Sequence, residues 1–212
     1  MKDFTRNVFV GISLSNKSFS QAAVSQINDV AVTQFRALRI AYLIADEIDL
    51  INMRLFDKGT ELSLRGRLSE KVREIEEVVV QGTTPPMKEV VQIFRWKHIL
   101  NARYWRLYYR LNSLFIYDAR FREDVVKIAQ LYAERRHRQL SESQMLYLSG
   151  YILAELPTLI EGIEIRGKKY RGMIYPSYQH ESMITILNCF RERVYEDDLG
   201  ELMSARVHQF EI

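Results

Sequence analysis

Four polar residues lie at positions where an enzyme built on a β-sheet could carry its reactive side chains. Ser13 directly follows a short apolar run, and a serine hydroxyl at the end of a strand can act as a nucleophile. Tyr175 ends a later apolar segment in the same way. Tyr151 and Glu155 are four residues apart, so a helix would place their hydroxyl and carboxylate on one face. In an open parallel sheet, ligands bind beyond the carboxyl ends of the strands, which makes that edge the expected site.

Each of these residues also has a common structural explanation. A serine after a strand is usually a loop or capping residue, and Ser13 lacks the G-x-S-x-G pattern of a hydrolase. Tyr151 and Glu155 could form an ordinary pair on a helix surface. However, we expect their helix to end near Leu156, because Pro157 cannot donate a backbone hydrogen bond and restricts the residue before it. A carboxylate in a last turn opposes the helix dipole, and a broken local rule favours a functional role.

The elements that would position these residues follow from the apolar pattern. Strand, helix and strand succeed one another within about 40 residues, and such a βαβ unit requires parallel strands. We expect strands at 8–12, 38–45, 90–95, 172–175 and 205–210. We expect helices at 18–35, 60–81, 141–156 and 181–194, with two more between 101 and 138. The prediction is one Rossmann-like α/β domain over residues 1–212, with a mostly parallel sheet flanked by helices.

Composition limits the class of protein. A hydrophobic fraction of 47% and a charged fraction of 27% over 212 residues exclude a disordered chain. The 30 Lys and Arg against 27 Asp and Glu give a net charge of +3, which permits a nucleic-acid partner without requiring one. The single cysteine, Cys189, excludes a disulfide framework and a cysteine-rich zinc site. No run approaches 18 apolar residues, so we expect a cytoplasmic protein without membrane association.

Metal and nucleotide sites are not expected. The four histidines are scattered without the spacing of metal ligands. Asp46, Glu47 and Asp49 follow the second strand and are interpreted as a solvated loop, although such a cluster could bind a cation. Neither G-x-G-x-x-G nor G-x-x-x-x-G-K-[ST] occurs, so the sequence offers no phosphate-binding glycine loop.

Three short motifs resemble those of tRNA-dependent cyclodipeptide synthases in their order and separation. They are Gly11-Ile12-Ser13 followed by Asn16, residues 151–157 (YILAELP) and residues 172–176 (GMIYP). The resemblance implies a fold similar to the catalytic domain of tyrosyl- and tryptophanyl-tRNA synthetases. It also implies an aminoacyltransferase that takes two aminoacyl-tRNAs and releases a cyclic dipeptide, a 2,5-diketopiperazine. Because an aminoacyl-tRNA ester is already activated, we expect that the enzyme needs no ATP. We also expect no other cofactor, no metal and a monomeric enzyme.

The resemblance assigns a role to each reactive residue. Ser13 would be the nucleophile that takes the first aminoacyl group as an ester. Tyr151 and Glu155 would hold the ammonium of that group, and Tyr175 would relay a proton when the dipeptidyl ester cyclises. The family branch stays open, because Asn16 is typical of one branch and a proline after the tyrosine is typical of the other, towards which we lean.

The same match implies a pocket for the first amino acid. Asn16 would hydrogen-bond near the acyl group, and Gly11 would leave space for it. Phe9, Ala41 and Met173 would form the walls, with Phe9 on the same side of its strand as Gly11. A phenyl ring takes up volume there, so we expect a small or medium aliphatic side chain rather than an aromatic one.

The tRNA surface is predicted on the helix at 60–81. Its basic residues are Arg65, Arg67, Lys71 and Arg73, and four glutamates on the same helix reduce its net charge. The basic run at 135–138 is a second candidate for the tRNA surface, unless it only compensates a helix dipole.

Two other functions stay open: a noncatalytic tRNA- or nucleotide-binding module on this fold and, with less support, a serine hydrolase.

Overall fold

A five-stranded parallel sheet forms the centre of the computed structural model, which describes residues 6–14, 19–176, 181–195 and 199–210. The strands, in the order β3-β2-β1-β6-β7, are Val91–Arg95, Arg39–Ile44, Asn7–Ile12, Gly172–Pro176 and Arg206–Phe210. Every neighbouring pair is parallel. This arrangement confirms the predicted Rossmann-like α/β fold and all five predicted strands.

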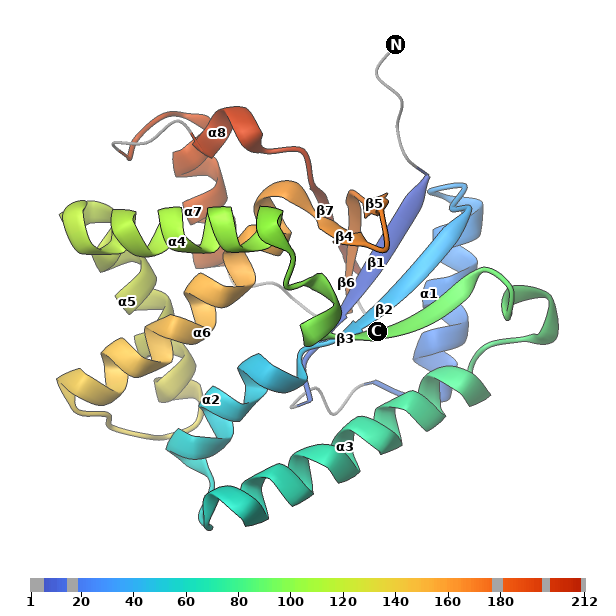
Figure 1. Cartoon of the computed structure of the whole chain (residues 1–212), viewed down its shortest axis with the longest axis horizontal. Coiled ribbons are helices and arrows are strands. Elements are labelled where there is room, and N and C mark those ends of the chain that lie inside the picture. Colours follow the sequence, from blue (N-terminus) through green and yellow to red (C-terminus); the bar gives the residue numbers. More distant parts are fainter. Residues whose placement is uncertain (1–5, 15–18, 177–180, 196–198, 211–212) are drawn as a thin grey trace.

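Helices cover both faces of the sheet (Figure 1). One face packs against α1 (Gln21–Thr33) and α3 (Glu61–Gln81). The other face packs against a larger group of helices: α4 (Ala102–Tyr117), α5 (Ala119–Arg135), α6 (Glu142–Glu161), α7 (Glu181–Arg191) and α8 (Leu199–Leu202). The chain also forms α2 (Asp46–Phe56), the short 3-10 helices η1 (Pro85–Met87) and η2 (Trp96–Ile99), and an antiparallel hairpin of β4 (Ile163–Ile165) and β5 (Lys168–Tyr170).

The alternation of side chains along β1 explains why both faces are apolar. Val8, Val10 and Ile12 belong to the core beneath α1 and α3, whereas Phe9 belongs to the core beneath α4 to α7. Successive strand residues point to opposite faces, so the Phe9 side of β1 also carries Gly11. The larger helical layer is therefore the layer that faces the predicted pocket.

The helix that carries Tyr151 starts as predicted and ends later than predicted. Ser141 and Gln144 form a capping box at the start of α6. The expected end near Leu156 is wrong, because Pro157 lies inside the helix, which continues to Glu161. The proline removes one backbone donor, but Leu156, Leu159 and Ile160 around it are fully buried and hold this turn in place.

The interpretation of the acidic cluster after β2 as a solvated loop is also wrong. Asp46, Glu47 and Asp49 form the first turn of α2, where the helix dipole favours carboxylates. Asp46 and Asp49 are buried, and Asp46 accepts a hydrogen bond from the backbone N–H of Trp96 at 3.0 Å. Asp46 and Asp49 therefore link α2 to its surroundings, and only Glu47 of the cluster is exposed to water.

The part of the chain that the structure describes contains no helix that is both long and apolar enough to cross a membrane. Within those same residues, no three histidine, cysteine or acidic side chains gather in a way that could hold a metal ion.

Candidate active site

A small cavity lies at the carboxyl ends of β1 and β6, beside α6. Its volume is about 20 Å³, which is room for about one water molecule. Ser13, Tyr151, Glu155 and Tyr175 all line it, although they come from three distant segments of the sequence. The strand order explains why these residues converge. From β1 the sheet continues to β2 on one side and to β6 on the other, and ligands bind at such a point of divergence.

Ser13 is held by a buried carboxylate of α2. Its Oγ donates towards both oxygens of Asp49, at 3.2 and 3.3 Å. The backbone N–H of Leu14 donates to Asp49 Oδ2 at 2.6 Å, and Asn52 Nδ2 donates to Oδ1 at 3.0 Å. Asp49 is only 3% exposed. Burial raises the pKa of this carboxyl, and the three donors oppose that rise by favouring the anion.

The remaining reactive groups share one apolar, acidic environment. Burial and the nearby charge of Asp49 raise the pKa of Glu155 to about 7. Burial also raises the pKa of Tyr151 and of Tyr175 well above the usual range, and the charge of Glu155 adds to both shifts. Both tyrosines therefore keep their protons and can donate hydrogen bonds, while Glu155 can gain or lose a proton near neutral pH.

One arginine of the basic run at 135–138 belongs to the edge of this site. Arg136 donates a hydrogen bond to the hydroxyl of Tyr132 at 2.7 Å, and its guanidinium lies over the rings of Tyr132 and Phe56. Tyr132 in turn stacks against Tyr151. Burial raises the pKa of Asp49, and the positive charge of Arg136 opposes part of this rise, so this arginine acts electrostatically on the cavity.

The predicted pocket walls lie where β1 and β6 pair. Phe9 and Met173 are partners in the parallel register, and both are buried. Gly11 also lines the cavity, and a Cβ built on it would lie 2.8 Å from Met173 Cε. Ala41 pairs with Phe9 and is buried, but the lining residues of β2 and the position after it are Leu43 and Ala45 instead. Asn16 lies outside the described residues.

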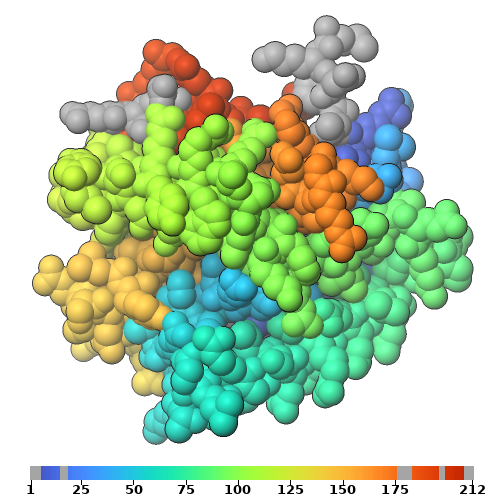
Figure 2. All heavy atoms as spheres, viewed as in Figure 1, coloured from blue at the N-terminus to red at the C-terminus, as the bar shows by residue number. Residues whose placement is uncertain are grey.

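An open aromatic groove adjoins the cavity. Its volume is about 430 Å³, and Ile48 and Trp96 line both spaces. The groove is formed by α2, η2, α4 and α6. In Figure 2, α2 (blue) is recessed, with η2 and α4 (green) on one side of it and α6 (yellow to orange) on another. The two shared side chains, each no more than 5% exposed, are the partition between the closed cavity and the groove.

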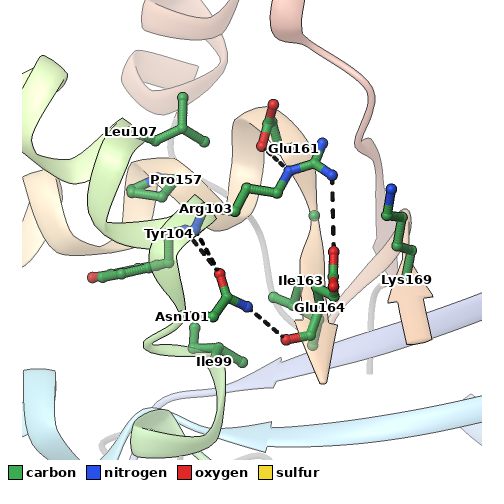
Figure 3. Close-up of a pocket in the computed structure, with 11 residues that line it drawn as sticks. Ile99, Asn101, Arg103, Tyr104, Leu107, Pro157, Glu161, Ile163, Glu164 and Lys169 are labelled. Atoms are coloured by element: carbon green, nitrogen blue, oxygen red, sulfur yellow. Dashed lines mark hydrogen bonds and ion pairs between the residues drawn. The ribbon is translucent and has the colours of Figure 1, made fainter. Parts of the chain in front are cut away.

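A third hollow lies at the C-terminal end of α6, beside Pro157 and Glu161 (Figure 3). There Arg103 forms ion pairs with Glu161 and, at 4.0 Å, with Glu164. Asn101 caps α4 and donates to the backbone carbonyl of Glu164 at 3.0 Å. These polar groups satisfy one another, so the cluster ties α4, α6 and β4 together and has a structural role.

Comparison with known proteins identifies the family. A family model described as cyclodipeptide synthase matches residues 3–183. The chain belongs to the cyclodipeptide synthase family. The synthase is therefore an enzyme, a tRNA-dependent aminoacyltransferase, as the sequence motifs predicted. A search of curated proteins finds no match.

Solved structures with the same fold are distant in sequence. A cyclodipeptide synthase from Bacillus thermoamylovorans has 16% identity and a TM-score of 0.72, over 98% of this chain and 87% of that one. The synthase from Candidatus Glomeribacter gigasporarum, solved with bound Phe-tRNAPhe, has 15% identity and a TM-score of 0.62, over 100% and 89%. The tryptophanyl-tRNA synthetase of Aeropyrum pernix has 16% identity and a TM-score of 0.52, over 96% and 47%. The last match agrees with the expected likeness to a tRNA synthetase fold.

The four basic residues predicted to bind tRNA lie on α3 of this synthase and are called the α3 cations below: Arg65, Arg67, Lys71 and Arg73. Three of them form ion pairs with acidic side chains nearby. Arg65 pairs with Glu61 at 2.8 Å, whereas Arg67 and Arg73 form longer pairs, at 3.4 and 3.9 Å, with Asp57 and Glu77. Their net positive charge is therefore locally reduced.

The residue that sequence reasoning missed in the site is Asp49. An acidic cluster in the first turn of a helix, directly after a buried strand of a parallel sheet, was the available signal. Ser13 and Asp49 follow two neighbouring strands, β1 and β2, so both lie at the same edge of the sheet. This placement brings the carboxylate to the serine.

Proposed function

We propose that this synthase joins the aminoacyl groups of two aminoacyl-tRNAs into a 2,5-diketopiperazine by a ping-pong route through Ser13. The observation that carries the proposal is the convergence of Ser13, Tyr151, Glu155 and Tyr175 on one cavity at the divergence of the strand order. A family member solved with bound Phe-tRNAPhe supports aminoacyl-tRNA as the substrate.

In the first half-reaction, Ser13 Oγ attacks the carbonyl carbon of the aminoacyl ester. The bond to the terminal ribose oxygen breaks, the tRNA leaves, and the aminoacyl group remains as an ester on Ser13. Glu155 and Tyr151 would hold the ammonium of this group. With a cation bound, the charged form of Glu155 is favoured, and its raised pKa of about 7 also allows it to take the proton that the amine must lose.

In the second half-reaction, the amine of the Ser13-bound residue attacks the ester carbon of a second aminoacyl-tRNA. The bond from that carbon to the terminal ribose oxygen breaks, the proton given up by the amine ends on that oxygen, and the second tRNA leaves. The product is a dipeptidyl ester on Ser13, and its free amine then attacks the Ser13 ester carbon to close the ring. Tyr175 would pass the proton from that amine to the departing Oγ. Its pKa, raised by burial, keeps it protonated and able to donate.

The pocket dimensions support a small or medium first residue. The cavity of about 20 Å³ is closed on one side by Phe9 and Met173 and on another by the partition of Ile48 and Trp96. A leucine-sized group requires movement of Met173, whose flexible side chain can give way. Neighbouring aliphatic products are expected in smaller amounts, because apolar pockets discriminate by about 1–3 kcal/mol per methylene.

The test is direct detection of the Ser13 ester. Purified protein is mixed with labelled aminoacyl-tRNA without ATP, quenched in acid and mapped by mass spectrometry. Wild type is expected to carry label on Ser13, whereas Ser13→Ala carries none and makes no cyclic product. Ser69→Ala is the matched control, since its hydroxyl lies exposed on α3 and bonds only locally, to the carbonyl of Arg65. A noncatalytic tRNA-binding module would bind the tRNA and acquire no label.

A further inference from the structure

The contact between Ser13 and Asp49 bears on how the nucleophile loses its proton. Ser13 Oγ lies 3.2 Å from one oxygen of Asp49 and 3.3 Å from the other, within the range of a hydroxyl donating to a carboxylate. Asp49 is fixed from two other directions by Leu14 N–H and the amide of Asn52. Asn52 Oδ1 is buried without a hydrogen-bond partner, so this amide is oriented by what it donates to Asp49.

We propose that Asp49 is the proton acceptor for Ser13 in the first half-reaction; the inference rests on the function proposed above. As Oγ forms its bond to the ester carbon, the hydroxyl proton passes to an Asp49 oxygen. When the bond between that carbon and the terminal ribose oxygen breaks, the proton passes on to the ribose oxygen, and the tRNA leaves with a neutral hydroxyl. Asp49 returns to its anionic state, and no other reactant is required.

The other groups around the cavity are less suited to this role. Tyr151 on α6 and Tyr175 on β6 are protonated, because burial raises the pKa of each, and a phenol in that state donates rather than accepts. Glu155 is the second carboxylate that lines the cavity, and in the proposed function it holds the ammonium of the aminoacyl group. None of the described residues that line the cavity is a histidine.

The surroundings of Asp49 keep an anion in a buried position. Burial of a carboxylate without hydrogen-bond partners costs free energy, and the hydrogen bonds from Ser13, Leu14 and Asn52 offset that cost. The charge of Arg136, at the end of α5, favours the anion further. Burial still raises the pKa of Asp49, and a carboxylate with a raised pKa is a stronger base than a free one.

The experiment measures the first half-reaction alone. Single-turnover acylation of Ser13 by labelled aminoacyl-tRNA is followed by rapid quench from pH 5 to 9 in wild type and Asp49→Asn. The substitution keeps the size of the side chain and one acceptor oxygen and removes the charge. General-base catalysis contributes about 10²–10⁴-fold, so acylation is expected to slow by about that factor while tRNA affinity is unchanged. At saturating aminoacyl-tRNA, where the effect of Glu155 on KM does not enter, the acidic limb that Asp49 imposes on the wild-type profile is also expected to disappear.

Two further variants separate proton transfer from a structural effect. Asp46→Asn makes the same change in the same turn of α2, where the carboxylate accepts a hydrogen bond from the N–H of Trp96 and does not line the cavity. This variant is expected to acylate at nearly the wild-type rate. Asn52→Leu removes a donor that stabilises the Asp49 anion, so the acidic limb is expected to move to higher pH. This second readout keeps the proposal testable if Asp49→Asn proves unstable in thermal denaturation.

The outcomes are distinct. Acylation of a folded Asp49→Asn within threefold of wild type, or a slower rate with an unchanged pH profile, overturns the role of Asp49. An unshifted profile in Asn52→Leu overturns it as well. If wild type carries no label on Ser13, the proposed function fails first and the Asp49 role fails with it.

Discussion

Gly11→Ala tests whether the cavity is as closely fitted as the structure shows. The added Cβ would lie 2.8 Å from Met173 Cε, closer than a normal contact, so one of the two groups must move. Overpacking a core costs about 1–3 kcal/mol. Because Cε is the free end of a flexible side chain, we expect a cost of about 1 kcal/mol, which lowers the Tm by about 2–4 °C in a domain of this size.

The effect on activity should be much larger than the effect on stability. A methyl group is similar in size to the single water molecule that the cavity of about 20 Å³ can hold, so the variant excludes a methylene or more of the first side chain. At about 1–3 kcal/mol per methylene, acylation of Ser13 should slow by about 10–200-fold. The remaining product should shift towards glycine or alanine at the first position.

The assay combines thermal denaturation, Ser13 acylation and mass spectrometry of the cyclic products. Gly150→Ala is the matched control, because nothing lies within 4 Å of a Cβ at that position of α6. Replacing a glycine inside a helix should stabilise the protein by about 0.5–1 kcal/mol and leave acylation unchanged. Wild-type acylation and an unchanged product range in a folded Gly11→Ala variant would refute the inference that Gly11 and Met173 define the pocket.

Three other predictions concern charge and proton transfer. The pKa of Glu155 is about 7, so its carboxylate is lost as the pH falls through 7, and the KM for aminoacyl-tRNA should rise in acid. Glu155→Gln should lower kcat/KM by about 10–100-fold, a loss of about 1.4–2.8 kcal/mol, and abolish this dependence; a retained dependence assigns it to another group. Tyr175→Phe should allow Ser13 to be acylated while slowing ring closure by about 10²-fold, measured by chase of the labelled ester, and closure at the wild-type rate excludes the relay. Charge reversal of the α3 cations should raise the KM for aminoacyl-tRNA and weaken its salt dependence; an unchanged KM would move the tRNA surface to the basic run at 135–138.

Much of the scaffold could be predicted because its signals are local. The run from Val8 to Ile12 is apolar without helical periodicity, and it forms a strand buried on both faces. Ser141 and Gln144 satisfy the first turn of α6 through their own side chains, so the start of that helix needs no information from elsewhere. The motifs around Ser13, Tyr151 and Tyr175 were assigned to one edge of the sheet, and the structure brings them to one cavity.

The errors arose where tertiary packing overrides local preference. Pro157 has a poor local propensity for a helix interior, but burial of the flanking Leu156 and Ile160 keeps the helix intact for another turn. The burial of Asp49 could not be deduced from an acidic sequence, because acidic clusters are usually solvated. Its role depends on the pairing of β1 with β2, which sets the end of one strand beside the helix that follows the other.

The charges of the cavity connect the two half-reactions. The carboxylates of Asp49 and Glu155 repel each other, and this repulsion contributes to the raised pKa of Glu155. In the proposed route, the ammonium of an aminoacyl group relieves this repulsion, so the carboxylate pair would favour the charged substrate. In the proposed route both amines become amides, and the finished diketopiperazine carries no charge. The carboxylate pair therefore attracts the two substrates and loses its electrostatic hold on the product, which favours release after ring closure.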